Sequence, residues 1–161
     1  MRTFQKQLLL DSEVECGMNI SRAVKERRSI RSFLRKDIPE KLINKLADAL
    51  IWAPSAGNLQ SRKFYFVKDA KLKKQIAGAA SNQEFIFDAP VVIVSCADLN
   101  IGRHYGQRGA ELYCIQDVSA SIMAMMLVAT ENGLGTCWVG SFNEHEIAKI
   151  MKLPDNLRPV A

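Results

Sequence analysis

Three arginines and a serine lie close together near the start of the chain, at Arg27, Arg28, Ser29 and Arg31. They fall where a predicted helix runs out into an extended stretch, in which alternate side chains point to one side. Arg27, Ser29 and Arg31 would then face one ligand. Guanidinium groups bind phosphate oxygens through charge-assisted, often bidentate hydrogen bonds. The pattern favours a phosphate site, and its alternative is a solvated cationic helix end.

A second candidate is the turn-rich loop PSAGNLQ, from Pro54 to Gln60. Gly57 and Asn58 tolerate backbone angles that other residues avoid. The amide side chains of Asn58 and Gln60 both donate and accept hydrogen bonds, which suits a polar heterocyclic ligand. The alternative for this loop is a plain connection between a helix and a strand.

The motifs of several other enzyme classes are missing from the sequence. There is no P-loop, GxSxG, HExxH or dinucleotide-binding GxGxxG pattern. His104 and His145 stand apart from any nucleophile or metal cluster, so we predict no metal site and no catalytic side chain of the hydrolase kind. The four cysteines are scattered without a CxxC pair, which indicates reduced thiols and, weakly, a cytoplasmic location.

The formal charge of +5 is concentrated in one segment. Residues 22–36 hold seven basic residues against the single acidic Glu26. Such a cluster suits one phosphate better than nucleic acid, because the only aromatic residue within it is Phe33. We therefore expect no nucleic-acid partner. The leucines near the N-terminus are too few for a signal peptide, and no segment predicts a membrane partner.

The elements that must position these residues follow from apolar periodicity and capping signals. Helices are predicted over residues 18–28, from Pro39 to Trp52, over 71–79 with Asp69 as cap, over 111–131, and over 144–151 with Asn143 as cap. Strands are predicted over 64–67, 89–97 and 136–139. The run at 89–97 is apolar throughout and should be central, covered on both faces. The helix over 111–131 is apolar nearly all round and should be buried on every side.

Mixed helices and strands without repeats or linkers predict one α+β or α/β domain over residues 18–161. Residues 1–17 are expected to form a poorly ordered leader extension. Whether the natural chain starts at Met1 or at Met18 stays open. The small residues Ser119, Ala120, Ser121 and Ala124 on the long helix would allow another helix to approach closely, as at a two-fold interface.

Three motifs in order resemble the nitroreductase family: RRSIR at residues 27–31, PSAGNLQ at 54–60 and GLGTCWVG at 133–140. The resemblance covers residues 20–161. It implies an α+β fold, an α-β-α sandwich whose mostly antiparallel sheet is flanked by helices. It also implies an intertwined homodimer with FMN bound at the interface between the two subunits.

The resemblance also implies the residues of the FMN site. Arg27, Arg28 and Ser29 match contacts to the phosphate and ribityl chain, and Arg31 matches a cation near the flavin N1 and O2. Asn82 matches a contact to the pyrimidine edge. The loop that reaches the flavin, in part from the partner subunit, corresponds to Pro54, Ser55, Ala56, Asn58 and Gln60. The strand end at the flavin N5 and O4 corresponds to Trp138, Val139 and Gly140.

The activity implied is ping-pong transfer of a hydride from NADH or NADPH, through FMN, to a nitroaromatic, quinone or similar small-molecule acceptor. No catalytic side chain is needed, because the cofactor carries the chemistry and Arg31 stabilises the charge of reduced flavin. The alternative is a flavin-binding dimeric protein with little or no turnover. It is motivated by the end of the sequence at LRPVA, without the usual C-terminal tail, in whose absence Arg27, Arg28 and Arg62 would carry more of the phosphate. A second departure, Ser61 and Arg62 in place of Pro-Trp, bears on packing beside the flavin and on acceptor specificity.

Overall fold

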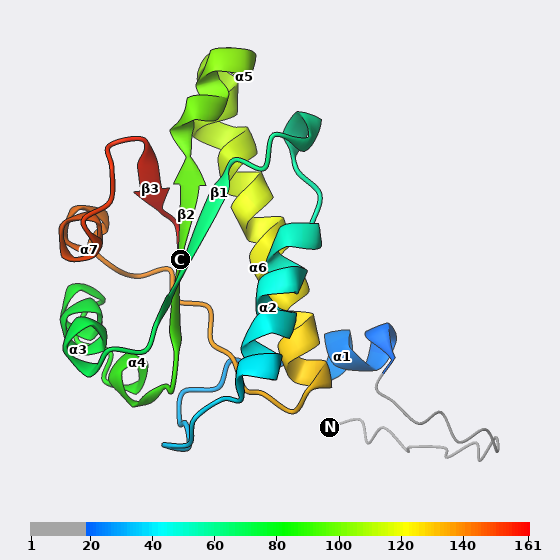
Figure 1. The fold of residues 1–161 in the computed structure, drawn as a ribbon, viewed down its shortest axis with the longest axis vertical. Coiled ribbons are helices and arrows are strands. Elements are labelled where there is room, and N and C mark those ends of the chain that lie inside the picture. Colours follow the sequence, from blue (N-terminus) through cyan, green and yellow to red (C-terminus); the bar gives the residue numbers. More distant parts are fainter. Residues whose placement is uncertain (1–18) are drawn as a thin grey trace, which may run out of the picture.

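A computed structural model describes residues 19–161 of the chain (Figure 1). The predicted leader over residues 1–17 lies outside the described residues. Helices are α1 (Ile20–Glu26), α2 (Glu40–Trp52), α3 (Ala70–Ala79), α4 (Phe85–Asp88), α5 (Gly102–Arg108), α6 (Cys114–Glu131) and α7 (Glu144–Met151). Short 3-10 turns occur at Ala56–Asn58 and Leu99–Ile101, and a π-turn at Gly109–Tyr113 leads into α6. Strands are β1 (Arg62–Val67), β2 (Val92–Asp98) and β3 (Leu157–Pro159).

The strands form one antiparallel sheet in the order β1-β2-β3, with β2 in the centre. Arg62 pairs with Ala97 and Val67 with Val92, while Cys96 pairs with Pro159. Side chains alternate across β2, so Ala97 joins the core on one face and Cys96 joins the core on the other. The prediction of a central strand covered on both faces is confirmed, although the strand begins at Val92 rather than Ala89.

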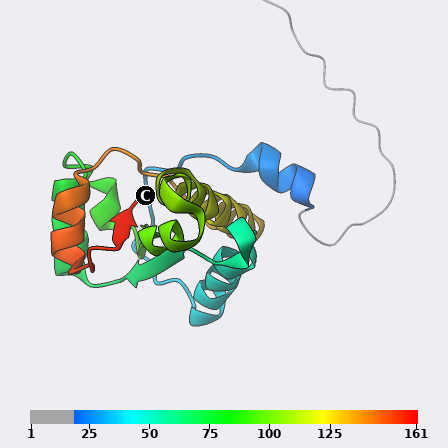
Figure 2. The same cartoon turned by 90° about the horizontal axis from the view of Figure 1, so that it is seen from above.

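Helices cover both faces of the sheet (Figures 1 and 2). The helices α2 and α6 pack together on one face, with Leu46, Leu50, Val118 and Ile122 among their buried residues. On the other face lie α3, α4 and α7, which bury Ile76, Ile86 and Ile147. The α+β class and the α-β-α sandwich are therefore confirmed, whereas the described chain is a single protomer.

Capping residues set the helix boundaries as the sequence predicted. The Asp69 side chain accepts a hydrogen bond from the Leu72 amide, and the Asn143 side chain accepts one from the Glu146 amide. Pro39 is the N-cap of α2 rather than its first helical residue. The helix α7 is tied to β3 by Arg158, whose two hydrogen bonds of 2.8 Å to Glu144 lower the pKa of that carboxyl.

One predicted strand is wrong. Residues 136–139 form no ladder in the described part of the chain; Thr136 makes only an isolated parallel bridge to Ser29. A strand needs a hydrogen-bonded neighbour along its length, and these residues instead line an apolar cleft of about 630 Å³. Residues Val92 to Ser95 of β2 also line this cleft.

The long helix α6 is buried on most of its surface. Val118, Ser121 and Ala129 are fully covered, yet Met123 remains 36% exposed. The expectation of burial on every side is thus not met within one protomer. The continuous helical stretch Leu99–Glu131 is long and apolar enough to cross a membrane by composition, but its packing against α2 and the sheet is that of a core helix.

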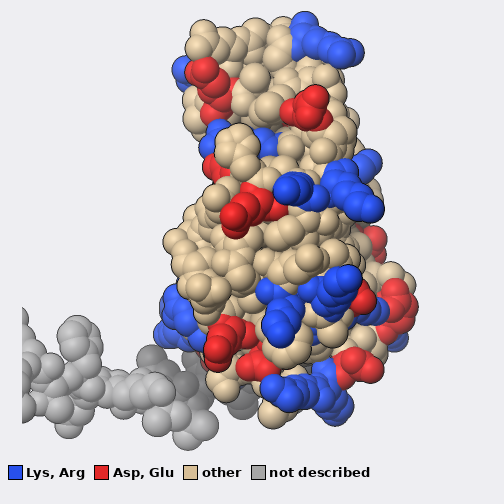
Figure 3. Space-filling model, turned by 90° about the vertical axis from the view of Figure 1, so that its left-hand side faces the viewer, with Lys and Arg blue, Asp and Glu red and all other residues tan. Residues whose placement is uncertain are grey.

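Figure 3 shows the surface on the side of α3, α4 and α7, where Lys and Arg alternate with Asp and Glu. The ion pair between Arg158 and Glu144 belongs to α7 and β3 on this side. Positive and negative side chains are mixed there, so this face presents no continuous basic surface of the kind that a nucleic-acid backbone prefers.

The cysteines yield a first testable prediction. Cys96 and Cys114 are fully buried, and burial raises the pKa of the Cys96 thiol to about 12. Because the thiolate is the reactive species, neither should react with iodoacetamide in the native protein at pH 8, whereas the partly exposed Cys137 should. Peptide mapping by mass spectrometry reads out each site separately. Labelling of Cys96 at the rate of Cys137 would contradict the packing of β2.

Candidate functional site

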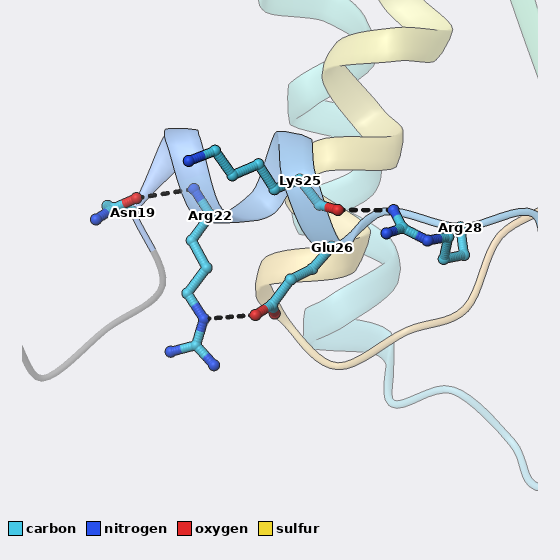
Figure 4. A network of polar contacts seen from close by, with 5 residues as sticks. All are labelled: Asn19, Arg22, Lys25, Glu26 and Arg28. Atoms are coloured by element: carbon cyan, nitrogen blue, oxygen red, sulfur yellow. Dashed lines mark hydrogen bonds and ion pairs between the residues drawn. The ribbon is translucent and has the colours of Figure 1, made fainter. Parts of the chain in front are cut away.

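The basic segment begins where α1 ends (Figure 4). Asn19 caps the helix by accepting a hydrogen bond from the Arg22 amide, and Arg22 pairs with Glu26 one turn later at 2.8 Å. The Arg28 guanidinium turns back and donates to the carbonyl oxygens of Lys25 at 2.6 Å and Arg27 at 2.8 Å. These are carbonyls that a helix leaves unpaired at its C-terminus, so Arg28 serves as a cap of α1.

The side chains of Arg27, Ser29 and Arg31 are free by comparison. Within residues 19–161 none of the three makes a hydrogen bond or an ion pair with its side chain, and Arg27 is half-buried. The Ile30 amide donates to the Thr136 carbonyl at 2.8 Å, which fixes the segment against the chain that follows α6. Two guanidinium groups and a hydroxyl are thus held on an anchored backbone and remain open to an anionic ligand.

The segment Trp138–Gly140 begins two residues after Thr136, whose carbonyl accepts the hydrogen bond from Ile30. Gly135 allows the close approach, since a Cβ there would lie 3.0 to 3.1 Å from the Ile30 side chain. Across residues 19–161, the amides of Trp138, Val139 and Gly140 donate no hydrogen bond. Trp138 is 37% exposed. Three consecutive amide donors are therefore available to a ligand next to the basic segment.

Asn82 is brought toward the Trp138–Gly140 segment by the contacts of the next residue, Gln83. It sits in the turn after α3 with a positive φ of 54° and an exposed side chain. The Gln83 side chain donates to the carbonyls of Ala80 at 2.8 Å and Ser141 at 3.2 Å. Since Ser141 follows Gly140, the structure brings Asn82 toward the end of the Trp138–Gly140 segment.

The loop from Pro54 to Gln60, the amide loop, has an unusual backbone. Gly57, Asn58 and Gln60 all have positive φ, at 56°, 56° and 51°. A Cβ on Gly57 would overlap the Tyr105 hydroxyl, so a larger residue there would require the Tyr105 side chain to move. The Ser55 hydroxyl accepts from the Gln60 amide at 3.0 Å. The loop closes on itself and leaves the Asn58 and Gln60 side chains exposed.

Three residues hold this loop: Ser61, Arg62 and Asp117. Of these, Arg62 was expected to bind phosphate, and Ser61 and Asp117 were not predicted as site residues. The Asp117 carboxylate, on α6, accepts from the Ala56 amide at 2.9 Å and from the Ser61 hydroxyl at 2.6 Å. The Arg62 guanidinium donates to the carbonyls of Ile51, Ala53 and Pro54. Burial lowers the pKa of Arg62, and the Asp117 charge partly offsets that effect. A carboxylate within an otherwise apolar helix was the signal in the sequence.

The structure brings two of the three predicted motifs together within one protomer and separates the third. Asp117, in the first turn of α6, binds the amide loop. Thr136 lies beyond the opposite end of that helix, which ends at Glu131. At 1.5 Å per residue, Asp117 and Glu131 are about 20 Å apart. Within one protomer the amide loop and the other two motifs therefore lie toward opposite ends of α6.

Within residues 19–161 no group of three or more His, Cys, Asp or Glu side chains is arranged to hold a metal ion. The site instead combines exposed cations, free backbone amides and side-chain amides beside an apolar cleft whose lining includes Ile30, Trp138 and Val139. Such a set suits a ligand with a phosphate at one end and a flat, partly polar ring system at the other.

Known proteins share both sequence and fold with this chain. The model of the Nitroreductase family matches residues 24–83 and 78–161. A nitroreductase family protein from Clostridium novyi NT superposes with a TM-score of 0.81 at 33% identity, over 89% of this chain and 82% of its own. An FMN reductase (NAD(P)H) of Bacillus subtilis is 28% identical, over 88% of this chain and 63% of its length. An NADH dehydrogenase of Thermus thermophilus is 40% identical over 77 residues, covering 48% of this chain and 38% of its length.

Proposed function

This chain belongs to the nitroreductase family, and from that membership and the geometry of the site we propose that it transfers a hydride from NADH or NADPH to a nitroaromatic, quinone or similar acceptor. Flavin-dependent oxidation of NAD(P)H is the activity that the family relationship supports, with FMN as cofactor. One observation carries the proposal: the free guanidinium groups of Arg27 and Arg31 lie on a segment anchored beside the free amides of Trp138–Gly140.

The residues present fit FMN. Arg27 and Ser29 offer a phosphate a guanidinium group and a hydroxyl that no other described side chain uses. The amides of Trp138, Val139 and Gly140 are donors for the polar edge of a ring. Arg28, which caps α1, contributes positive charge beside the phosphate rather than a direct contact. FMN, when bound, supplies the hydride-accepting and hydride-donating chemistry.

The protein contributes orientation and electrostatics. Arg31 supplies a positive charge, which favours negative charge on the ring system next to it. The amide loop of the partner subunit adds the carboxamides of Asn58 and Gln60, which donate to and accept from polar ring atoms. Asn82 adds a further amide at the end of the Trp138–Gly140 segment. Reductant and acceptor then use the same open face in turn, so steady-state kinetics are ping-pong.

The homodimer that this arrangement needs has a matching surface. Large apolar side chains are exposed on α1, α2 and α6: Ile20, Val24, Ile51, Trp52 and Met123. In Figures 1 and 2, α1 projects away from the body of the protomer beside α6. Exposed apolar residues in such number favour association with another surface, and we propose a second copy of this chain as the partner, in the cytoplasm.

A single substitution on α2 tests the dimer. Trp52 is 85% exposed in the protomer, so replacing it with Asp removes little buried surface within one chain. We expect Trp52→Asp to shift the protein from dimer to monomer at micromolar concentration, because it places a charge in an apolar interface. Sedimentation velocity measures the change. Lys63→Asp, on the exposed part of β1, is the control and should leave the dimer intact.

The visible spectrum of the purified protein tests the proposed function most directly. We expect absorption bands of bound flavin, or their appearance after FMN is added and excess removed, and bleaching on anaerobic addition of NADPH or NADH. Menadione or a nitroaromatic should then restore the oxidised spectrum and sustain NAD(P)H consumption. A protein that takes up no FMN contradicts the proposal, and one that binds FMN without turnover points to a flavin-binding protein.

A further inference from the structure

A buried carboxylate bridges the two ends of the amide loop. Asp117 is 5% exposed, and each of its carboxylate oxygens has one partner from a different end of that loop. The Ala56 amide, near the start, donates to Oδ1 at 2.9 Å. The Ser61 hydroxyl, just after the end, donates to Oδ2 at 2.6 Å. Asp117 comes from α6, so it connects the loop to the central helix of the core.

The backbone of the loop needs such support. Asn58 and Gln60 both occupy the left-handed region, which costs residues other than glycine free energy and persists only when the surroundings impose it. Hydrogen bonds within the loop, from the Asn58 amide to Ser55 and from the Leu59 amide to Ala56, close its turns but do not attach it to the core. At its end the Ser61 carbonyl accepts from the Asp98 amide of β2 at 3.0 Å, and the attachment to α6 comes from Asp117.

The charge of Asp117 has a nearby counter-ion. Its field acts on Arg62, whose guanidinium binds the carbonyls of Ile51, Ala53 and Pro54 at 2.6 to 2.9 Å. Arg62 thereby holds the chain that enters the loop, while Asp117 holds the loop itself. A buried carboxylate with two hydrogen bonds and a neighbouring cation resists displacement, because moving it would leave an unpaired charge in the interior.

We propose that Asp117 is a positioning residue of the flavin site: it fixes the amide loop in the conformation that presents Asn58 and Gln60 to FMN bound at the partner subunit. The inference rests on the proposed function for the identity of the ligand. The anchoring itself is a property of the protein without cofactor. Asp117 does not touch the ligand and acts only through the loop.

The test compares three variants of the full-length chain. Asp117→Ala removes both acceptors, and Ser61→Ala removes one hydrogen bond with little change in volume. Asp117→Asn keeps the shape and an acceptor for the Ala56 amide, while the Ser61 hydroxyl can turn to accept from the new amide. Ser121→Ala is the matched control: Ser121 is fully buried one turn further along α6, and its hydroxyl donates only to the Asp117 backbone carbonyl.

Hydrogen exchange of the apoprotein measures the anchor without any cofactor. Amides of residues 55–61 should exchange about tenfold faster in Asp117→Ala than in the wild type, with smaller acceleration in Ser61→Ala and little change in the other two variants. Exchange in α2 and α3 should stay the same. Equal acceleration across the whole chain, or none in the loop, overturns the proposal. If Asp117→Ala does not fold, Ser61→Ala against Ser121→Ala decides the question.

Titration with FMN then links the anchor to the site. The FMN dissociation constant should rise about tenfold in Asp117→Ala and return to within about threefold of the wild type in Asp117→Asn. A loosened loop with unchanged FMN affinity overturns the positioning role. Failure of the wild type itself to bind FMN contradicts the proposed function, and the exchange result distinguishes that outcome from failure of the anchor.

Discussion

Replacing Arg27 with Ala is expected to weaken FMN binding by about 10- to 100-fold. Arg27 is half-buried, and its guanidinium has no partner among the described residues, so it is available for a phosphate. A hydrogen bond to a charged group contributes about 1.5 to 3 kcal/mol, which corresponds to this range of affinity. Quenching of flavin fluorescence during titration at constant ionic strength gives the dissociation constant directly.

A matched control separates a specific contact from the general effect of positive charge. Arg35→Ala removes the same charge from the same basic segment, but the Arg35 side chain is 79% exposed and already pairs with Asp88 at 2.8 Å. We expect it to change FMN affinity by less than about threefold, as for a screened surface charge. The FMN affinity of Arg27→Lys should lie between those of Arg27→Ala and the wild type, because an ammonium keeps the positive charge but lacks the planar guanidinium fork. Equal losses in Arg27→Ala and Arg35→Ala would argue against a phosphate site at Arg27.

The sequence was sufficient to predict elements whose signals are local. Asp69 and Asn143 cap their helices as expected, because the capping bond spans only three residues. The apolar run that forms β2 indicated a strand buried on both faces, since such a strand has no polar side. Resemblance to the nitroreductase family added the order of the elements and the sandwich architecture, which periodicity alone left open between α+β and α/β.

Features that depend on distant partners were not predictable in this way. Residues 136–139 have the composition of a strand, but strand formation depends on a neighbour, and Ser29 provides only one bridge. The link between Asp117 and Ser61 spans 56 residues of sequence, and nothing near Ser61 indicates it. Arg28 was grouped with the ligand contacts, although the local end of α1 uses its guanidinium instead. The separation of the amide loop from the other motifs depends on the length of α6, along which Asp117 and Glu131 are about 20 Å apart.

Substitution of Leu50 with Ala is expected to lower the free energy of unfolding by about 3 kcal/mol, within the range of 2 to 5 kcal/mol found for buried leucines. Leu50 is 1% exposed and belongs to the core cluster that joins α2 to α6, together with Val118 and Ile122. Truncation removes buried apolar surface and leaves a cavity between two helices that the sheet holds in place. Urea unfolding of the apoprotein, followed by circular dichroism, measures the loss.

Leu34→Ala isolates the contribution of burial, since it deletes the same atoms from a side chain that is 81% exposed. Its effect should remain within about 0.5 kcal/mol, as for most surface substitutions. Both variants are compared at one protein concentration, so that subunit association contributes equally. Similar losses in the two variants would mean that α2 is not packed against α6. The helix that leads into the amide loop would then lack the rigid support on which the proposed flavin site depends.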